Sequence, residues 1–314
     1  MPPQNPPFET EIVPYDQEGI ARAAALILEG LPVAVPTETV YGLAADATDD
    51  GAVARIYEAK GRPGFNPLIV HVPDFPAAER IGDFTPNARA AAERYWPGPL
   101  TLVVPLRSDA RIVPAVTAGL PTIAIRCPAS AAMQDLLRAC GRPLAAPSAN
   151  ASGGVSPTTA SHVLRSLGGR IPLIVDSGPT RIGLESTIVA FDGDAPRLLR
   201  AGPIAFDAAP SSGGRIEAPG QLSSHYAPSK PLRLDAREAA ADEWLIGFGT
   251  VEGDDTLSSS GDMEEAAASL FAALHRADLS SRTRIAVAPV PGEGIGRAIN
   301  DRLTRAAAAK GEGR

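Results

Sequence analysis

The sequence of 314 residues predicts an α/β protein with a twisted mixed sheet and a second, smaller α/β domain. Three features lead to this prediction. Between residues 9 and 207, short apolar runs typical of strands alternate with helical patterns. A segment rich in Gly, Ser and Pro at 208–220 then interrupts the pattern. From 231 to 314 the alternation resumes on a smaller scale.

Four parts follow from these breaks. We expect a loose tail at 1–8, a large domain at 9–207, a linker at 208–230 and a small domain at 231–314.

The helices of the large domain are predicted from apolar spacing and from their end signals. At 17–29, apolar residues fall near helical spacing and Gly30 ends the helix. Asp49 or Asp50 caps the next helix, which ends at Gly61. Further helices are expected at 85–95, 130–139 and 158–166.

The strands of the large domain are predicted from short apolar runs bounded by Gly, Pro and polar residues. The run at 122–126 alternates strictly, as a half-buried strand does. Another strand ends at Arg200. The other strands are expected at 32–36, 67–72, 100–106, 144–146, 171–176 and 186–191.

The small domain shows three strands that alternate with three helices, a pattern compatible with an independent parallel sheet. The first helix is expected between the first two strands. The strands are expected at 232–234, 244–248 and 284–289, and the other helices at 262–277 and 295–309.

The composition is that of a globular protein, with 44% hydrophobic and 21% charged residues. No apolar run is long enough to span a membrane, and the Pro-rich start does not resemble a secretory signal. Cys127 and Cys140 fit neither a disulfide framework nor a metal pattern. We therefore expect a cytoplasmic protein with two reduced thiols.

The net charge of −7 argues against a bulk binder of polyanions, so any anion site has to be a local basic pocket. Four scattered histidines without zinc-ligand spacing argue against a structural zinc site. Of 29 basic residues only three are lysines, and one of them is Lys60. The composition therefore favours, at that position, a compact charge on a flexible stem over the planar fork of arginine.

Polar residues follow two of the predicted elements early in the chain. The segment at 36–42 gathers two hydroxyls, a carboxylate and a phenol, and fits an ordinary turn as well as a binding site. The loop after the next helix presents Lys60 and Arg62, two cations that can complement the helix dipole or clamp an anion. Asn66 and His71 enter a buried strand just after it, where polar groups need partners, which favours the clamp.

Two later segments have a similar character. At 145–153 a strand runs into a hydroxyl- and Gly-rich loop before a helix, whose first N–H groups form a natural anion site. Thr158 also fits a cap of that helix. Ser186 opens a strand, and Arg200, taken alone, fits a surface residue. The sequence lacks a Walker loop, a G-x-G-x-x-G motif and a G-x-S-x-G elbow, so the common nucleotide and serine-hydrolase sites are not predicted.

Together these segments resemble the threonylcarbamoyl-AMP synthases over residues 10–205, which implies a YrdC-like catalytic domain. The rest resembles the extra domain of the long form of these enzymes, a Rossmann-like α/β unit, at 225–228, 264–278 and 294–307. The matching runs of the first part are PTETVYGL, EAKGRP, NPLIVHV, YWPGPLTLV, TIAIRCP, PLAAPSAN, SPTTA, GLESTIV and LLRAGPI.

The resemblance implies a nucleotidyltransferase reaction. L-threonine, bicarbonate or carbon dioxide, and ATP give threonylcarbamoyl-adenylate and pyrophosphate. Mg²⁺ accompanies the ATP phosphates, and no protein side chain is assigned to the metal. A partner transferase complex then passes the threonylcarbamoyl group to an adenosine next to the anticodon of certain tRNAs. Neither membrane contact nor stable nucleic-acid binding is expected, and catalysis rests on positioning and charge neutralisation.

The resemblance also implies roles for single residues. Catalytic roles fall to Lys60, Arg62, Ser148 and Asn150, the last two as polar partners of the basic pair. L-threonine is held by Thr39, His71, Arg126, Ser186 and the backbone of Ala146. ATP is held by Arg62, Asn66, Thr122, Ser148, Ser156, Arg200, His225 and Tyr226. We expect Arg62 to face solvent and to contribute little to stability.

The linker departs from the family pattern, because Gln221, Leu222 and Ser223 stand where Met, Lys and Tyr are common. His225 and Tyr226 match it, so we expect the linker to close over the cavity as a lid. A non-catalytic RNA-binding protein is the alternative, disfavoured by the acidic charge and by the lack of stacking aromatics on a basic face. A carbamoyl-transferring maturation factor would carry zinc-finger-like cysteine clusters, which two lone cysteines exclude.

Overall fold

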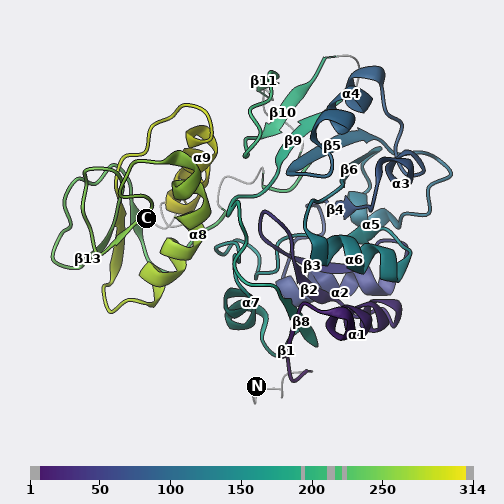
Figure 1. The fold of residues 1–314 in the computed structure, drawn as a ribbon, viewed down its shortest axis with the longest axis horizontal. Coiled ribbons are helices and arrows are strands. Elements are labelled where there is room, and N and C mark those ends of the chain that lie inside the picture. The colour runs from purple at the N-terminus through teal and green to yellow at the C-terminus, as the bar shows by residue number, and fades with distance from the viewer. Residues whose placement is uncertain (1–7, 192–194, 211–215, 221–224, 309–314) are drawn as a thin grey trace.

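The computed structural model describes residues 8–191, 195–210, 216–220 and 225–308. They form two units (Figure 1): a large mixed sheet with helices on both faces, and a smaller sheet. Helices α8 (Met263–Leu279) and α9 (Gly296–Ala308) of the small unit lie on the side that faces the large one. Gln221, Leu222 and Ser223 lie outside the described residues, as does most of the predicted tail.

The large sheet contains parallel and antiparallel pairs, so the predicted mixed α/β fold is confirmed. The first three strands in its spatial order are parallel, and the next two are antiparallel to their neighbours. In spatial order the described strands are β1 (Glu11–Pro14), β8 (Leu173–Asp176), β2 (Val33–Pro36), β3 (Tyr41–Asp46), β7 (Leu144–Ala145), β4 (Ile69–His71), β6 (Thr122–Arg126), β5 (Leu100–Pro105), β9 (Thr187–Ala190), β10 (Arg197–Arg200) and β11 (Ala209–Pro210).

Helices cover the two faces of this sheet unequally. Along β2, Val33 and Val35 face one layer and Ala34 the other, as the two-residue period of a strand requires. The first layer consists of α1 (Gln17–Leu28) and α6 (Ala131–Cys140), which pack on β2 and its neighbours. The opposite layer contains α2 (Asp50–Lys60), α3 (Phe75–Glu79), α4 (Pro86–Tyr95), α5 (Pro114–Thr117) and α7 (Ala160–Leu167).

Strands β4, β6, β5 and β9 carry a small apolar cluster on the face that α1 and α6 cover elsewhere. Leu144, which packs with α1 and α6, is the register partner of His71, so His71 and Ile69 share this face. Ile69 pairs with Ala124 of β6, and both belong to the cluster. Its other members are Val103, Ile188, Ala190, Leu199 and Ala218. Ile69 lines the cavity described below, and we call the cluster to which it belongs the floor of the candidate site.

The small unit is a four-stranded sheet, parallel throughout the part of the chain that the structure describes. Apolar side chains of α8 and α9 pack against it and also against Val40, Leu184 and Tyr226 from outside the small unit. Its strands, in spatial order, are β12 (Leu232–Arg233), β15 (Arg284–Val287), β13 (Glu243–Gly247) and β14 (Asp255–Thr256).

Helix α2 ends as its sequence predicts, and this ending positions the basic loop. Asp49 is the cap, since its side chain accepts from Gly51 N and Ala52 N. Gly61 adopts φ 60°, a left-handed conformation that glycine takes without a Cβ penalty. The chain therefore turns directly after Lys60 and sends the next residues toward the floor.

The helix expected between the first two strands of the small domain is absent, so that prediction is wrong. Glu243 accepts from Ala240 N and forms an ion pair with Arg233, contacts that hold the segment as a turn. Asp235 has φ 56°, which a helix cannot include. Tertiary contacts therefore override the helical pattern.

Other differences are local. At 36–42, where the sequence fits a turn as well as a binding site, the chain turns at 37–40 and continues as β3 from Tyr41. Thr159, not Thr158, caps α7, because its hydroxyl accepts from His162 N. The prediction also lacks β1, β11, β14, α3 and α5, which are short elements that the tertiary structure stabilises.

Candidate active site

A cavity lies over the apolar floor, with about 530 Å³ of free space among its side chains when the open mouth is included. Its walls come from segments far apart in the sequence, at strand ends and in the linker. Ten of the predicted site residues line it: Thr39, Arg62, His71, Arg126, Ala146, Ser148, Ser186, Arg200, His225 and Tyr226.

Strand register explains why these distant residues meet. His71 of β4 pairs with Arg126 of β6 at the ends of two parallel strands. Ser186 precedes β9, and its Oγ lies 2.7 Å from Thr101 Oγ1 of β5. The polar groups thus stand at the end of the same sheet face whose middle is apolar, where open α/β sheets place ligands.

Arg126 is buried at one end of the cavity. Its Nη2 donates to Glu38 Oε1 at 2.7 Å, Nη1 to Thr39 Oγ1 at 3.0 Å and Nε to Gly98 O at 3.2 Å. A guanidinium carries five N–H donors, so two remain for a ligand. Burial alone would raise the pKa of Glu38, but the guanidinium brings that pKa below its ordinary value. The sequence alone indicates no role for this carboxylate, which lies in the segment at 36–42.

His71 lies beside this guanidinium, and its Nδ1 has no hydrogen-bond partner among the described residues. Burial and the nearby positive charge lower its pKa to about 3. The imidazole is therefore neutral at physiological pH and can donate a hydrogen bond to a ligand or accept one from it. The backbone N–H of Ala146 is already used, because it donates to Ile69 O at 2.9 Å.

Lys60 does not point into the cavity but lies behind its wall. Its Nζ donates to Ser148 O and Asn150 O, each at 2.5 Å, and its side chain is buried. Ser148 and Asn150 are the partners that the resemblance implies, but Lys60 contacts their backbone carbonyls and not their side chains. Burial, followed by the charge of Arg62, lowers the pKa of this ammonium well below its ordinary value.

Arg62 is buried, so the prediction that it faces solvent is wrong. It is 9% exposed, and its Nε and Nη2 donate to Asn66 O at 3.1 Å and Pro67 O at 2.8 Å. Gly61 turns the chain inward at this point, which the sequence alone does not reveal. Burial lowers the Arg62 pKa to about 10, which still leaves it charged at neutral pH. The side chain of Asn66 is buried, with Oδ1 unpartnered among the described residues.

Arg200 is also buried, so the surface reading of this residue is wrong. It spans from Ser186 to the linker: Nε donates to Ser186 O and Nη2 to Ser186 Oγ, each at 3.0 Å. Its Nη1 contacts Pro219 O at 3.5 Å. A Cβ at Gly220 would lie 2.7 Å from Tyr226 Oη and 3.0 Å from Arg200 Cδ, so this close packing requires glycine.

His225 and Tyr226 form the wall of the cavity that the linker supplies. Tyr226 is 1% exposed and has φ 62°, an uncommon conformation for a bulky residue. His225 Nδ1 and Tyr226 Oη have no hydrogen-bond partner among the described residues. Burial lowers the pKa of His225 to about 3, so its ring is neutral.

Three predicted nucleotide contacts, Asn66, Ser156 and Thr122, lie outside the lining. Ser156 donates to Glu185 Oε1 at 2.5 Å, and Glu185 lines the cavity in its place. Thr122 begins β6, four residues from Arg126, at the far end of the same strand face. The structure therefore does not bring Thr122 to the cavity.

Unpartnered polar atoms concentrate around this cavity. Seven of the nine buried side-chain N and O atoms without a partner in the described residues belong to residues of this site or directly behind it. Buried polar groups normally find partners, so this concentration indicates a ligand-binding site. The seven belong to Glu38, Asn66, His71, Asn150, His225, Tyr226 and Arg302.

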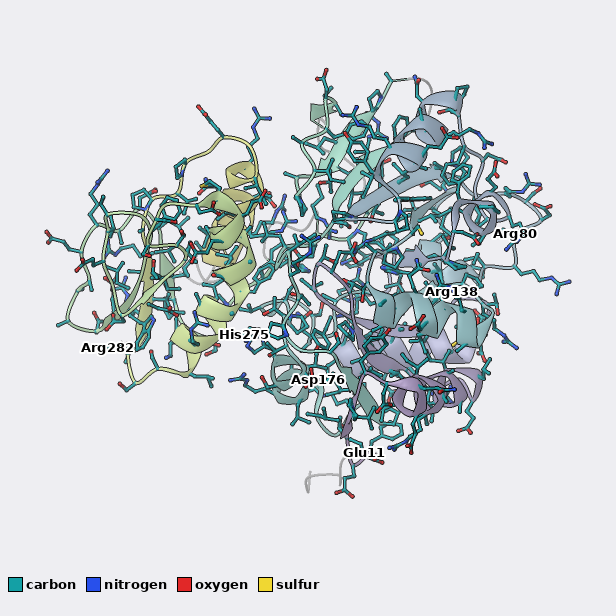
Figure 2. All side chains as sticks on the ribbon, viewed as in Figure 1. Glu11, Arg80, Arg138, Asp176, His275 and Arg282 are labelled. Carbon is teal, nitrogen blue, oxygen red and sulfur yellow. The ribbon has the colours of Figure 1, made fainter. Side chains whose placement is uncertain are left out.

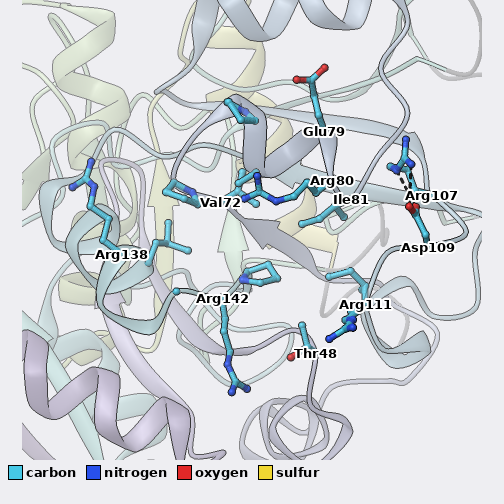
Figure 3. Close-up of a pocket in the computed structure, with 17 residues that line it drawn as sticks. Thr48, Val72, Glu79, Arg80, Ile81, Arg107, Asp109, Arg111, Arg138 and Arg142 are labelled. Atoms are coloured by element: carbon cyan, nitrogen blue, oxygen red, sulfur yellow. Dashed lines mark hydrogen bonds and ion pairs between the residues drawn. The ribbon is translucent and has the colours of Figure 1, made fainter.

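A larger hollow, with about 2100 Å³ of free space when its open mouth is included, lies elsewhere on the large unit (Figure 3). Arginines surround it, but Arg107, Arg138 and Arg142 are paired with carboxylates and are partly exposed to solvent. It contains none of the predicted site residues. Size alone therefore does not identify the active site.

The described residues contain no group of three His, Cys, Asp or Glu side chains that could hold a metal. Among those residues, no helix is long and apolar enough to cross a membrane. Cys127 and Cys140 are both buried and free.

Comparisons with known proteins agree with the geometry. Residues 25–202 match a family described as telomere recombination, and residues 198–308 match the threonylcarbamoyl-AMP synthase C-terminal domain. The threonylcarbamoyl-AMP synthase of Bacillus subtilis is 42% identical and covers 92% of each chain. That of Pyrococcus abyssi is 39% identical over 90% of this chain and 92% of its own.

A solved structure extends the likeness to three dimensions. The crystal structure of P. abyssi Sua5 complexed with L-threonine has a TM-score of 0.84 to this chain at 36% identity. It covers 96% of this chain and 98% of its own. The chain therefore belongs to the threonylcarbamoyl-AMP synthase family.

Proposed function

We propose that this protein makes L-threonylcarbamoyladenylate from L-threonine, bicarbonate or carbon dioxide, and ATP, with release of pyrophosphate. The observation that carries the proposal is the cavity itself. Three buried arginines, Arg62, Arg126 and Arg200, surround a space with unpartnered polar atoms and an apolar floor. Such a site suits a small zwitterion together with a polyanion that carries an apolar ring.

L-threonine would occupy the end near Arg126. The two remaining N–H donors of that guanidinium can take the amino-acid carboxylate. His71, neutral at working pH, and Ser186 stand close enough to this end to recognise the amine and hydroxyl. Glu38 would keep Arg126 in place while neutralising part of its charge.

ATP would lie across the floor toward Arg62 and Arg200, the two guanidinium groups at the other side of the cavity. Mg²⁺ would arrive with the phosphates and neutralise charge on them. Glu185 lines the cavity, but its two oxygens are occupied by Ser156 and Arg302. The phosphates, rather than this carboxylate, would therefore supply the metal's ligands.

The chemistry needs two bond-forming steps. The threonine amine adds to carbon dioxide to give a carbamate, and its proton passes to solvent or to bicarbonate-derived base. A carbamate oxygen then attacks the α-phosphorus of ATP, and pyrophosphate leaves. Neither step needs a covalent enzyme intermediate, so the protein acts by positioning the reactants and by placing fixed positive charge near the phosphates.

The linker would open to admit the substrates. Only about 40 Å³ of the cavity can hold the centre of a water molecule, enough for about three waters. ATP and threonine together need far more room. We infer that the segment with His225 and Tyr226 moves outward for binding and returns for the reaction, as a lid does.

The product is a reactive mixed anhydride, so a transferase has to consume it soon after release. We propose that this acceptor system acts on tRNA next to the anticodon, and that the protein works in the cytoplasm. The non-catalytic RNA-binding alternative gains no support from the comparisons, whose matching full-length relatives carry an enzyme's name.

Pyrophosphate release tests the proposal. Purified protein with ATP, Mg²⁺ and bicarbonate should release pyrophosphate only when L-threonine is added. Release without threonine, or none at all from folded protein, would contradict it. D-threonine serves as the matched control, because it has the same charge and composition but the wrong configuration for the Arg126 end.

A further inference from the structure

One arginine of the small unit reaches into the polar network beside the cavity. Arg302, on α9, is fully buried. Its Nε donates to Glu185 Oε2 at 2.9 Å and its Nη1 to Ala201 O at 2.8 Å, both outside the small unit. Asp301 also accepts from Nη1 at 2.9 Å. The ion pair between Arg302 and Glu185 therefore joins the two units next to the candidate active site.

Glu185, which lines the cavity, passes this contact on to Ser156 behind the cavity wall. Its other oxygen accepts from Ser156 Oγ at 2.5 Å. Burial alone would raise the pKa of Glu185, but Arg302 first and Arg200 next bring it below its ordinary value. Arg302 therefore helps to keep this carboxylate ionised, which is the form that accepts most strongly from Ser156.

Arg302 also supports the linker wall. Its guanidinium carbon lies 5.2 Å from the centre of the Tyr226 ring, a cation–π distance. The other side chain in ring contact with Tyr226 from the small unit is Phe271 of α8, with ring centres 5.7 Å apart. His225 N donates to Arg305 O at 3.4 Å. The small unit thus holds both residues of the lid in their closed position.

A second contact brings α8 to the same place. His275 of α8, labelled in Figure 2, lies between α8 and the large unit. Its Nε2 is 3.1 Å from Ser156 O, and its ring stacks on His162 with centres 3.9 Å apart. The small unit therefore holds Ser156 at two atoms. His275 contacts its carbonyl oxygen directly, and Arg302 acts on its hydroxyl through Glu185.

Threonine binding does not depend on these contacts in the same way. Ser186 is fixed by Thr101 Oγ1 and by Arg200, neither of which belongs to the small unit. Arg126 is fixed by Glu38, Thr39 and Gly98. Loss of the Arg302 contact should therefore disturb the nucleotide side of the cavity and spare the amino-acid side.

We propose that Arg302 is a positioning residue for ATP, through which the small domain completes the nucleotide side of the active site. It fixes Glu185, and with it Ser156, and it steadies Tyr226 over the cavity. This inference rests on the proposed function. It assigns to the small domain a direct part in nucleotide binding rather than a separate ligand of its own.

The test compares steady-state kinetics of the full-length protein and of Arg302→Met, which keeps much of the volume but removes the charge. We expect the KM for ATP to rise about tenfold or more, since charge-assisted contacts are lost, while the KM for L-threonine stays within about threefold. Arg297→Met is the matched control, because Arg297 is exposed on the same helix. It should leave both constants unchanged.

Glu185→Gln gives an independent measurement where Arg302→Met folds poorly. It preserves shape and should also raise the KM for ATP, and the double variant should be no worse than the poorer single one. Arg302→Lys should recover part of the loss, since it restores the charge but not the planar fork. Equal rises in both KM values, or normal ATP binding in stable variants, would overturn the inference. An inactive wild-type protein would instead overturn the proposed function.

Discussion

Lys60 anchors the wall of the cavity, and replacing it by methionine separates this role from direct phosphate binding. Methionine keeps most of the apolar stem and removes the ammonium that donates to Ser148 O and Asn150 O. Each buried carbonyl that loses its donor costs about 1–3 kcal/mol, and the relieved desolvation of the ammonium offsets part of the sum. We expect Lys60→Met to lose about 2–4 kcal/mol of unfolding free energy.

Thermal unfolding and turnover measure the two consequences separately. The expected loss corresponds to a fall in Tm of roughly 5–15 °C for a domain of this size. Turnover measured well below that Tm should fall at least about 100-fold, because the loop with Ser148 is no longer held in place.

Lys230→Met is a closely matched control for this change. Lys230 also donates to two backbone carbonyls, Ala277 O at 2.9 Å and Ser280 O at 2.7 Å, and it is not among the residues that line the cavity. It should cost stability without lowering turnover. An unchanged Tm for Lys60→Met, with turnover still lost, would refute the anchor and assign Lys60 to the phosphates.

Three further predictions follow from burial. Arg62→Met should raise the KM for ATP at least about tenfold and also lower Tm, because the guanidinium donates to two buried carbonyls. If calorimetry shows no change in Tm, the buried position of Arg62 is contradicted. Tyr226→Phe should leave Tm unchanged but weaken ATP binding in titration calorimetry, since the buried hydroxyl has no partner in the described residues. An unchanged affinity for ATP would argue against a contact between this hydroxyl and the nucleotide. Each of the four histidines has a folded-state pKa below its ordinary value, at about 3 or 4, so the unfolded chain takes up protons first as pH falls. The unfolding free energy should therefore be highest above pH ~6.5 and fall toward pH ~4. The fully buried His71 alone should contribute a fall of about 1.4 kcal/mol per pH unit. An unfolding free energy from urea titrations that does not change over that pH range would refute this prediction.

Local signals in the sequence predict much of the fold. Asp49 and Gly61 mark the ends of α2, and the alternation at 122–126 marks β6, because caps and strand periods act within a few residues. The pattern fails where distant contacts decide. The small domain lacks its first predicted helix because Arg233 and Glu243 pair across a turn.

The candidate site shows the same division. The order of the motifs indicates the family and most of the residues that line the cavity. It does not indicate the direction in which a side chain points. Lys60 and Arg62 lie two positions apart in the sequence, yet Lys60 supports a loop behind the cavity wall and Arg62 lines the cavity. Glu185 and Arg302 lie 117 positions apart, and no local pattern links them.

We expect this cavity to join threonine, a one-carbon unit and AMP into one molecule. Incubation with ATP, Mg²⁺, L-threonine and carbon-13 bicarbonate, followed by rapid mass spectrometry, measures whether it does. We expect a new adenylate with the mass of threonylcarbamoyl-AMP, heavier by the single labelled carbon, formed together with pyrophosphate. Pyrophosphate release with an unlabelled adenylate, or with AMP bound to threonine through its own carboxylate, would contradict the account.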